Sequence, residues 1–258
     1  MNTALVVAYI SAAVALVSAA FSGWTQLHLM KRGRRLDAKA VLDRYRGPLL
    51  DAAWQLGDRL ENIRHGSFFD YLSQGSGREQ DAKLTTLFRF AYYLGWREFV
   101  RTQVQLLRFE NAKGTRRVAG FLNDVTWVLA SDRVDGQWAM LWGDEQRGIG
   151  ELMIESQSGA STIVRGHAAF HRDYEKVFGP WMERFAHDLC SPAAKDRSRL
   201  RLLQWALYGL VRQLDEEGVY GVGWIEKSAD EIRQKAPNES PTKYWLQLKE
   251  HLNEIGSL

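Results

Sequence analysis

The sequence predicts an all-α fold, with one transmembrane helix ahead of a cytoplasmic helical bundle. Three observations support this prediction. The first is an uncharged, apolar N-terminal stretch that ends at a group of basic residues. The second is a long segment in which apolar residues recur at spacings of three and four, the period of an amphipathic helix. The third is one exception to that period, over residues 154–166, where a short β-hairpin or an irregular extended segment is expected.

The N-terminal stretch has the length and composition of a membrane anchor. No Lys, Arg, Asp or Glu occurs between residues 2 and 30. A helix needs about 20 apolar residues to cross a hydrocarbon core of ~30 Å. We therefore expect residues 1–30 to form a single transmembrane helix that contacts the lipid bilayer over residues 3–30. Trp24 falls where an aromatic ring would lie at the membrane interface.

Basic residues predict which side of the membrane the domain occupies. Lys31, Arg32, Arg34 and Arg35 follow the apolar stretch, whereas the N-terminal flank supplies only the α-amino group. The positive-inside bias then predicts an outside N-terminus and a cytoplasmic C-terminal domain. These four cations, together with Trp24, are the predicted membrane-surface contacts.

Two other interpretations of the apolar stretch are open at this stage. Residues 18–20 are small enough to resemble a signal-peptide cleavage site, although the first three residues provide no basic region. A buried core helix is the other interpretation, but such helices are usually shorter than this uncharged run. The small residues of the stretch also allow two anchors to approach closely and dimerise.

Three parts follow the anchor. We expect a basic juxtamembrane linker helix over residues 31–47, a cytoplasmic helical domain over 48–217 and an appendage over 218–258. Glycines interrupt the beginning of the appendage, and a final amphipathic helix ends it.

Glycine and proline divide the first half of the domain into helices. Pro48 is expected in the first turn of a helix that ends near Gly66, since a first turn tolerates proline. Gly95 is expected to separate two helices, because glycine is a poor residue in a helix interior. A further helix carries apolar residues at helical spacing over 118–129.

The second half shows the same punctuation. Asp144 is expected to cap a short helix that ends at Leu152. Helix is expected again from about residue 167 to 177, with a break at Gly179-Pro180 before the next helix. The clearest periodicity lies over 200–214, where leucines recur at spacings of three and four and predict a long, packed helix.

Four blocks of the sequence together resemble a family of uncharacterised actinobacterial proteins. The blocks are RYRGPLLDAAWQLGDRLENI (44–63), YLGWREFVRTQVQLL (93–107), GDEQRGIGEL (143–152) and GHAAFHRDYEKVFGPWMERFAHDL (166–189). The resemblance covers residues 36–217. It implies an N-terminal hydrophobic helix, a basic step and a helical body of this size, and it implies no particular activity.

Charged residues of the 143–152 helix form the first candidate site. Arg147 and Glu151 are four residues apart and share a helical face, while Glu145 lies on another side. A carboxylate and a guanidinium beside the irregular 154–166 segment can bind a polar ligand or move a proton. An ion pair between helices, or a solvated face, explains the same residues, and this structural interpretation is favoured.

His167 and His171 form the second candidate. Their spacing of four places two imidazoles on one helical face, as in some zinc sites. Ala168 stands where an HExxH motif has glutamate, and two histidines alone specify little, so we predict no metal and no cofactor. The chain also has no nucleophile elbow, phosphate-binding loop or zinc-type cysteine pair, which favours a non-enzymatic role.

Composition bears on the partners. The balance of 34 Lys+Arg against 31 Asp+Glu gives a net charge of +3, too small to indicate a nucleic-acid partner. The single Cys190 excludes an intramolecular disulfide, in agreement with a reducing compartment. Trp224 and Trp245 in the appendage are the predicted partner contacts. The tryptophans expected in the core are Trp54, Trp96, Trp127, Trp138, Trp142, Trp181 and Trp205.

Two hypotheses about function follow. The favoured one is a single-pass membrane protein whose cytoplasmic domain binds another protein or a second copy of itself. The alternative is a membrane-tethered enzyme or ligand sensor that uses Glu145, Arg147, Glu151, His167 and His171.

Overall fold

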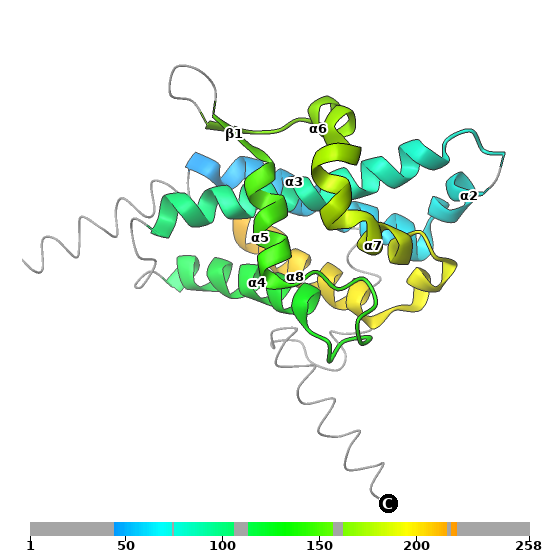
Figure 1. Ribbon diagram of the computed structural model, residues 1–258. Coiled ribbons are helices and arrows are strands. Elements are labelled where there is room, and N and C mark those ends of the chain that lie inside the picture. Colours follow the sequence, from blue (N-terminus) through cyan, green and yellow to red (C-terminus); the bar gives the residue numbers. More distant parts are fainter. Residues whose placement is uncertain (1–43, 74, 106–112, 157–161, 216–217, 221–258) are drawn as a thin grey trace, which may run out of the picture.

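A computed structural model describes residues 44–73, 75–105, 113–156, 162–215 and 218–220 (Figure 1). This part of the chain is mostly helical, which confirms the all-α prediction for the domain. The predicted anchor and most of the predicted linker helix lie outside the described residues. After a helix over residues 44–65, the elements are α2 (Phe68–Leu72), α3 (Glu79–Gln105), α4 (Lys113–Ala130), α5 (Gly143–Leu152), β1 (Ile154–Ser156), β2 (Thr162–Val164), α6 (His167–Asp173), η1 (Tyr174–Phe178), α7 (Gly179–Leu189), η2 (Pro192–Asp196) and α8 (Ser198–Leu214).

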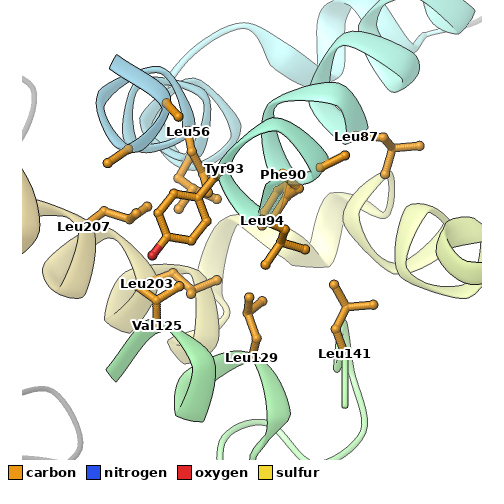
Figure 2. Packing of buried hydrophobic residues seen from close by; sticks show 14 of the residues in the cluster. Leu56, Leu87, Phe90, Tyr93, Leu94, Val125, Leu129, Leu141, Leu203 and Leu207 are labelled. Carbon is orange, nitrogen blue, oxygen red and sulfur yellow. The ribbon is translucent and has the colours of Figure 1, made fainter. Parts of the chain in front are cut away.

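The core lies between four helices. Side chains from the 44–65 helix, α3, α4 and α8 meet there, and Figure 2 shows their contact. Each helix contributes residues at spacings of three or four, so burial of one apolar face accounts for the helical period of the sequence. The labelled residues are Leu56, Leu87, Phe90, Tyr93, Leu94, Val125, Leu129, Leu141, Leu203 and Leu207.

The first helix ends at residue 65, next to Gly66 as predicted, but its predicted beginning is wrong. The chain is already helical at residue 44, so Pro48 lies beyond the first turn of this helix. Packing accounts for the extra turn, because the Tyr45 ring contacts Phe99 of α3 at 4.9 Å between ring centroids. Aromatic packing of this kind offsets the main-chain hydrogen bond that proline cannot donate.

The predicted helix break at Gly95 is also wrong, because α3 continues through it. A β-carbon at residue 95 would lie 2.7 Å from Met153 Cβ and 3.0 Å from Val164 Cγ1. Gly150 of α5 has the same role opposite it, since a β-carbon there would lie 2.8 Å from Leu94 O. These glycines allow α3 and α5 to approach closely, so Gly95 serves packing and not chain termination.

The 154–166 exception to the helical period contains the predicted hairpin. β1 and β2 pair antiparallel, with Ile154 opposite Val164. The hairpin follows α5 and packs on α3 through β2, where the side chain of Val164 lies against Gly95.

The predicted break at Gly179-Pro180 does not occur. α6, the π-helical turn η1 and α7 follow one another without a gap. Pro180 lies in the first turn of α7, where a missing N–H costs little. Tyr174, Phe178, Met182 and Phe185 are all buried, and this shared apolar face accounts for the continued helix across the wide turn.

One buried arginine connects α8 to the end of α4. Arg199 is fully buried, and its guanidinium donates hydrogen bonds only to main-chain carbonyl groups. Two of these acceptors, the carbonyls of Val128 and Leu129, lie in the last turn of α4, where the helix dipole favours a cation. The Leu129 carbonyl also accepts a hydrogen bond of 2.9 Å from the main-chain N–H of Leu141. The remaining acceptors lie in the 131–138 loop, which Arg199 therefore fixes. They are the carbonyl groups of Ser131, Val134, Gly136 and Trp138.

Candidate functional site

Glu145 caps the helix that carries it. Its carboxylate accepts a hydrogen bond of 2.7 Å from the main-chain N–H of Trp142. Trp142, not Asp144, therefore occupies the N-cap position, and the prediction of Asp144 as the cap is wrong. The Asp144 side chain, in the first turn of α5, is instead 98% exposed. Glu145 Oε2 also lies 3.8 Å from Arg184 of α7.

The other two α5 candidates lie at the surface. Arg147 is half exposed, and its guanidinium is 3.9 Å from the Asp144 carboxylate. Glu151 is exposed near Arg101 of α3. Hydrogen bonding to Glu98 is the main cause of a raised Arg101 pKa, and the Glu151 charge adds a smaller contribution. The Arg147–Asp144 ion pair lies at the surface, where such pairs are worth little in stability.

His167 and His171 lie on one face of α6, with their ring centroids 4.7 Å apart. The His167 ring stands edge-on to Phe88 of α3 at 5.0 Å, and its Nε2 lies 3.4 Å from Thr85 Oγ1. Partial burial lowers the pKa of His167, His171 lowers it further, and Asp81 opposes the shift. The buried Nε2 of His171 makes no hydrogen bond to any described residue.

A buried glutamine connects α5 to the rest of the domain. Gln146 is 1% exposed and donates hydrogen bonds to Thr126 O of α4 and to Leu141 O. Its side-chain oxygen accepts a hydrogen bond of 2.7 Å from Arg97 of α3. α5 is therefore fixed by its inner face, while its outer face carries Trp142, Glu145 and the charged residues described above.

Two tryptophans that were predicted to lie in the core are exposed. Trp142 is 60% exposed and Trp181 of α7 is 42% exposed. The Trp181 ring lies over α5, where a β-carbon on Gly148 would approach it to 2.9 Å. Arg184, one turn further along α7, donates a hydrogen bond to Met140 O and faces Glu145. We call Trp142, Glu145, Trp181 and Arg184 the α5–α7 tryptophan surface.

Local sequence accounts for the exposure of both rings. Trp142 immediately precedes Gly143 at the start of α5, and Trp181 follows Gly179-Pro180 at the start of α7. A residue at a helix start lies at the edge of the packed face, and glycine supplies no side chain to cover it. The position at a helix start, and not a glycine neighbour alone, separates these two rings from the core tryptophans, since Trp96 follows Gly95 inside α3 and packs against the core. Trp54, Trp96, Trp127, Trp138 and Trp205 pack against the core as predicted.

Several predicted contacts lie outside the described residues. They are the membrane-surface residues Trp24, Lys31, Arg32, Arg34 and Arg35, and the appendage residues Trp224 and Trp245. Of the appendage, the structure describes 218–220, where Asp215 accepts hydrogen bonds from the amides of Val219 and Tyr220. The Tyr220 ring then packs on Trp54, with 5.6 Å between centroids.

Comparisons with protein-family models, with curated proteins and with solved structures find no significant match to this chain. Across residues 44–220, with the gaps noted above, no helix is long and apolar enough to cross a bilayer. The same described ranges contain no group of three or more His, Cys, Asp or Glu side chains that could hold a metal ion. The candidate sites therefore rest on the geometry of this chain alone.

Proposed function

We propose that this protein is a single-pass membrane protein whose helical domain binds another protein, or a second copy of itself, at the cytoplasmic face of a bacterial inner membrane. The observation that carries the interaction role is the α5–α7 tryptophan surface. Exposed tryptophan beside arginine is the composition of binding hot spots, because large rings bury much area with little loss of conformational freedom.

The anchor supports the location of this domain. Residues 2–30 carry no charged side chain, and four cations follow within residues 31–35. A stretch of this length spans a bilayer, and the cations favour the cytoplasmic side. A domain held at a membrane is confined to a thin layer, which raises its effective concentration toward partners in the same membrane.

The use of the buried polar residues supports an interaction role over a catalytic one. Arg199 binds main-chain carbonyl groups, and Gln146 connects three parts of the bundle. Glu145 serves a helix cap. Polar groups in these positions hold the fold together, and each has hydrogen-bond partners within the domain.

A second candidate function is ligand sensing at the α6 histidines. The supporting observation is the unpartnered Nε2 of His171 beside the His167 ring. Glu145, Arg147 and Glu151 contact other residues in the described structure, so this membrane-tethered enzyme or sensor would rest on the two histidines of α6. A bound metal or metabolite in the purified protein would favour this candidate over the interaction role.

The interaction role is tested on full-length protein in mild detergent. Light scattering after size separation gives the mass of protein in the complex for the unchanged chain and for the double variant Trp142→Ala, Trp181→Ala. We expect the unchanged chain to form an assembly of two or more protein chains. The double variant should assemble with an affinity at least about tenfold lower, as is found when hot-spot residues are truncated. Trp127→Phe, at a packed position, is the matched control and should keep the assembly. Equal assembly in the double variant and the control would contradict the assigned surface.

A further inference from the structure

One end of the bundle is rich in exposed cations. Figure 1 shows that α3 ends and α4 begins at the end where the 44–65 helix starts in the described structure. Arg44 and Arg117 are exposed there, and Arg101 is partly exposed on the last turns of α3. We call Arg44, Arg101 and Arg117 the basic end.

Two carboxylates near the basic end are already engaged, while Glu151 is exposed near Arg101. Glu98 is only 2% exposed and accepts hydrogen bonds from Arg101. Asp215, at the end of α8, is held by the amides of Val219 and Tyr220. Arg46 donates a hydrogen bond to Leu214 O, which fixes the end of α8 beside the start of the 44–65 helix. The exposed charge of the described residues at this end is therefore dominated by Arg44 and Arg117.

Chain connectivity brings the basic end toward the membrane. The apolar stretch ends at Met30, and the described helix has formed by Arg44. The residues between them span about 20 Å as a helix and at most about 45 Å if fully extended. Residues 31–46 contain seven cations against two carboxylates, so the same sign of charge continues from the anchor into the bundle.

We propose that the basic end rests against the anionic headgroups of the bilayer that holds the anchor. This inference rests on the proposed function, since it requires the anchor. Clustered Lys and Arg next to a membrane segment are attracted to anionic lipid over about one Debye length. Contact at this end orients the bundle with its long axis away from the bilayer. Residues 75–78, in the turn before α3 at the other end in Figure 1, then lie farthest from the lipid.

The test uses full-length protein in nanodiscs of either neutral phosphatidylcholine or a mixture of phosphatidylcholine and phosphatidylglycerol. Hydrogen exchange is followed by mass spectrometry over the first turns of α4. We expect several-fold slower exchange of these amides in the anionic nanodiscs, and no such difference over residues 75–78. The double variant Arg44→Glu, Arg117→Glu should lose the difference. The matched control Arg78→Glu, Arg133→Glu changes two exposed cations outside the basic end and should keep it.

Two results would overturn the lipid contact while leaving the anchor intact. One is equal exchange of the α4 amides in neutral and anionic nanodiscs, which would show that anionic headgroups do not cover the basic end. The other is equal loss of protection in both double variants. Extraction of the full-length chain from vesicles by alkaline carbonate, measured in parallel, would instead overturn the anchor and with it the proposed function.

Discussion

At the scale of single residues, Arg199 holds two distant parts of the chain together. Its guanidinium satisfies carbonyl groups at the end of α4 and in the loop that follows, while Asp135 Oδ2 accepts a hydrogen bond of 2.7 Å from its main-chain N–H. Burial lowers the pKa of Arg199 to about 10, with Asp135 the first of the charges that oppose the shift. Below that pH the residue is a buried cation whose compensation comes mainly from carbonyl dipoles.

Replacement of this cation should therefore be severe. Arg199→Met leaves several buried carbonyl groups without donors, and we expect the free energy of unfolding to fall by about 3–5 kcal/mol. Arg199→Lys keeps the charge but loses most of the planar set of donors, so its effect should be intermediate. Urea unfolding of the full-length protein in detergent, followed by circular dichroism, measures both. The exposed Arg78→Met is the control, and equal stability of Arg78→Met and Arg199→Met would show that the carbonyl contacts are unimportant.

His167 gives a prediction for pH. Its pKa in the folded protein lies below the ordinary value of 6.5, because partial burial and His171 disfavour the cation. The unfolded chain therefore takes up a proton before the folded one, and the free energy of unfolding falls as the pH drops through the region just below 6.5. His167→Gln should flatten this dependence, and an unchanged dependence in this variant would contradict the assignment to His167. Melting temperatures measured from about pH 5 to about pH 8, the range in which histidine titrates, test this prediction.

At the scale of elements, close helix packing decides where glycine belongs. α3 and α5 approach so closely that Gly95 and Gly150 have no room for a side chain. In α4, by contrast, a β-carbon on Gly120 would meet nothing within 4 Å. The same residue type therefore has opposite consequences in two helices of one domain.

Alanine substitution separates these two situations. Gly150→Ala forces a β-carbon against Leu94 O, a main-chain atom that cannot rotate away, and should destabilise the protein by about 1–3 kcal/mol. Gly120→Ala should stabilise it by about 0.5–1 kcal/mol, because alanine is the better helix former. Thermal unfolding of the two variants side by side measures the difference. Stabilisation in both would mean that α5 can shift away from α3 at little cost.

Periodicity predicts those elements that bury one apolar face. The helices over 44–65, α4 and α8 were predictable because their leucines and valines recur at helical spacing, and the β-branched residues after Ile154 indicated the hairpin. The predicted breaks at Gly95 and at Gly179-Pro180 are wrong for one physical reason. In both places tertiary packing outweighs the local preference of glycine and proline, and a single sequence does not show which neighbour will fill the space.

The candidate sites were predictable only in part. Spacing alone places His167 and His171 on one face, and the structure brings their rings together. The α5–α7 tryptophan surface could not be found in this way, because Trp142 and Trp181 belong to different helix starts and only the packing of α7 places the Trp181 ring over α5 at Gly148. The same limit applies to Arg199, whose acceptors come from a loop about 60 to 70 residues earlier in the chain.

At the scale of the whole molecule, the proposals divide the surface between two partners. The basic end faces anionic lipid near the anchor, and the α5–α7 tryptophan surface lies along the side of the bundle, where it is open to a protein. A domain with this orientation can meet partners that diffuse in the same membrane without lifting away from it. The appendage that carries Trp224 and Trp245 leaves the described structure at Tyr220, packed on Trp54.

The central claim is that the intact, membrane-anchored chain binds other protein chains and is not a receptor for a metal or small molecule. Native mass spectrometry of the full-length protein, released from membranes in mild detergent, tests this claim most directly. The account predicts complexes that contain two or more protein chains, each copy of this chain having its whole mass of 29.5 kDa. A single chain that has lost its first 20 or so residues would show a cleaved signal peptide and contradict the anchor. A single intact chain with a bound metal or metabolite would contradict the interaction role and favour the α6 histidines.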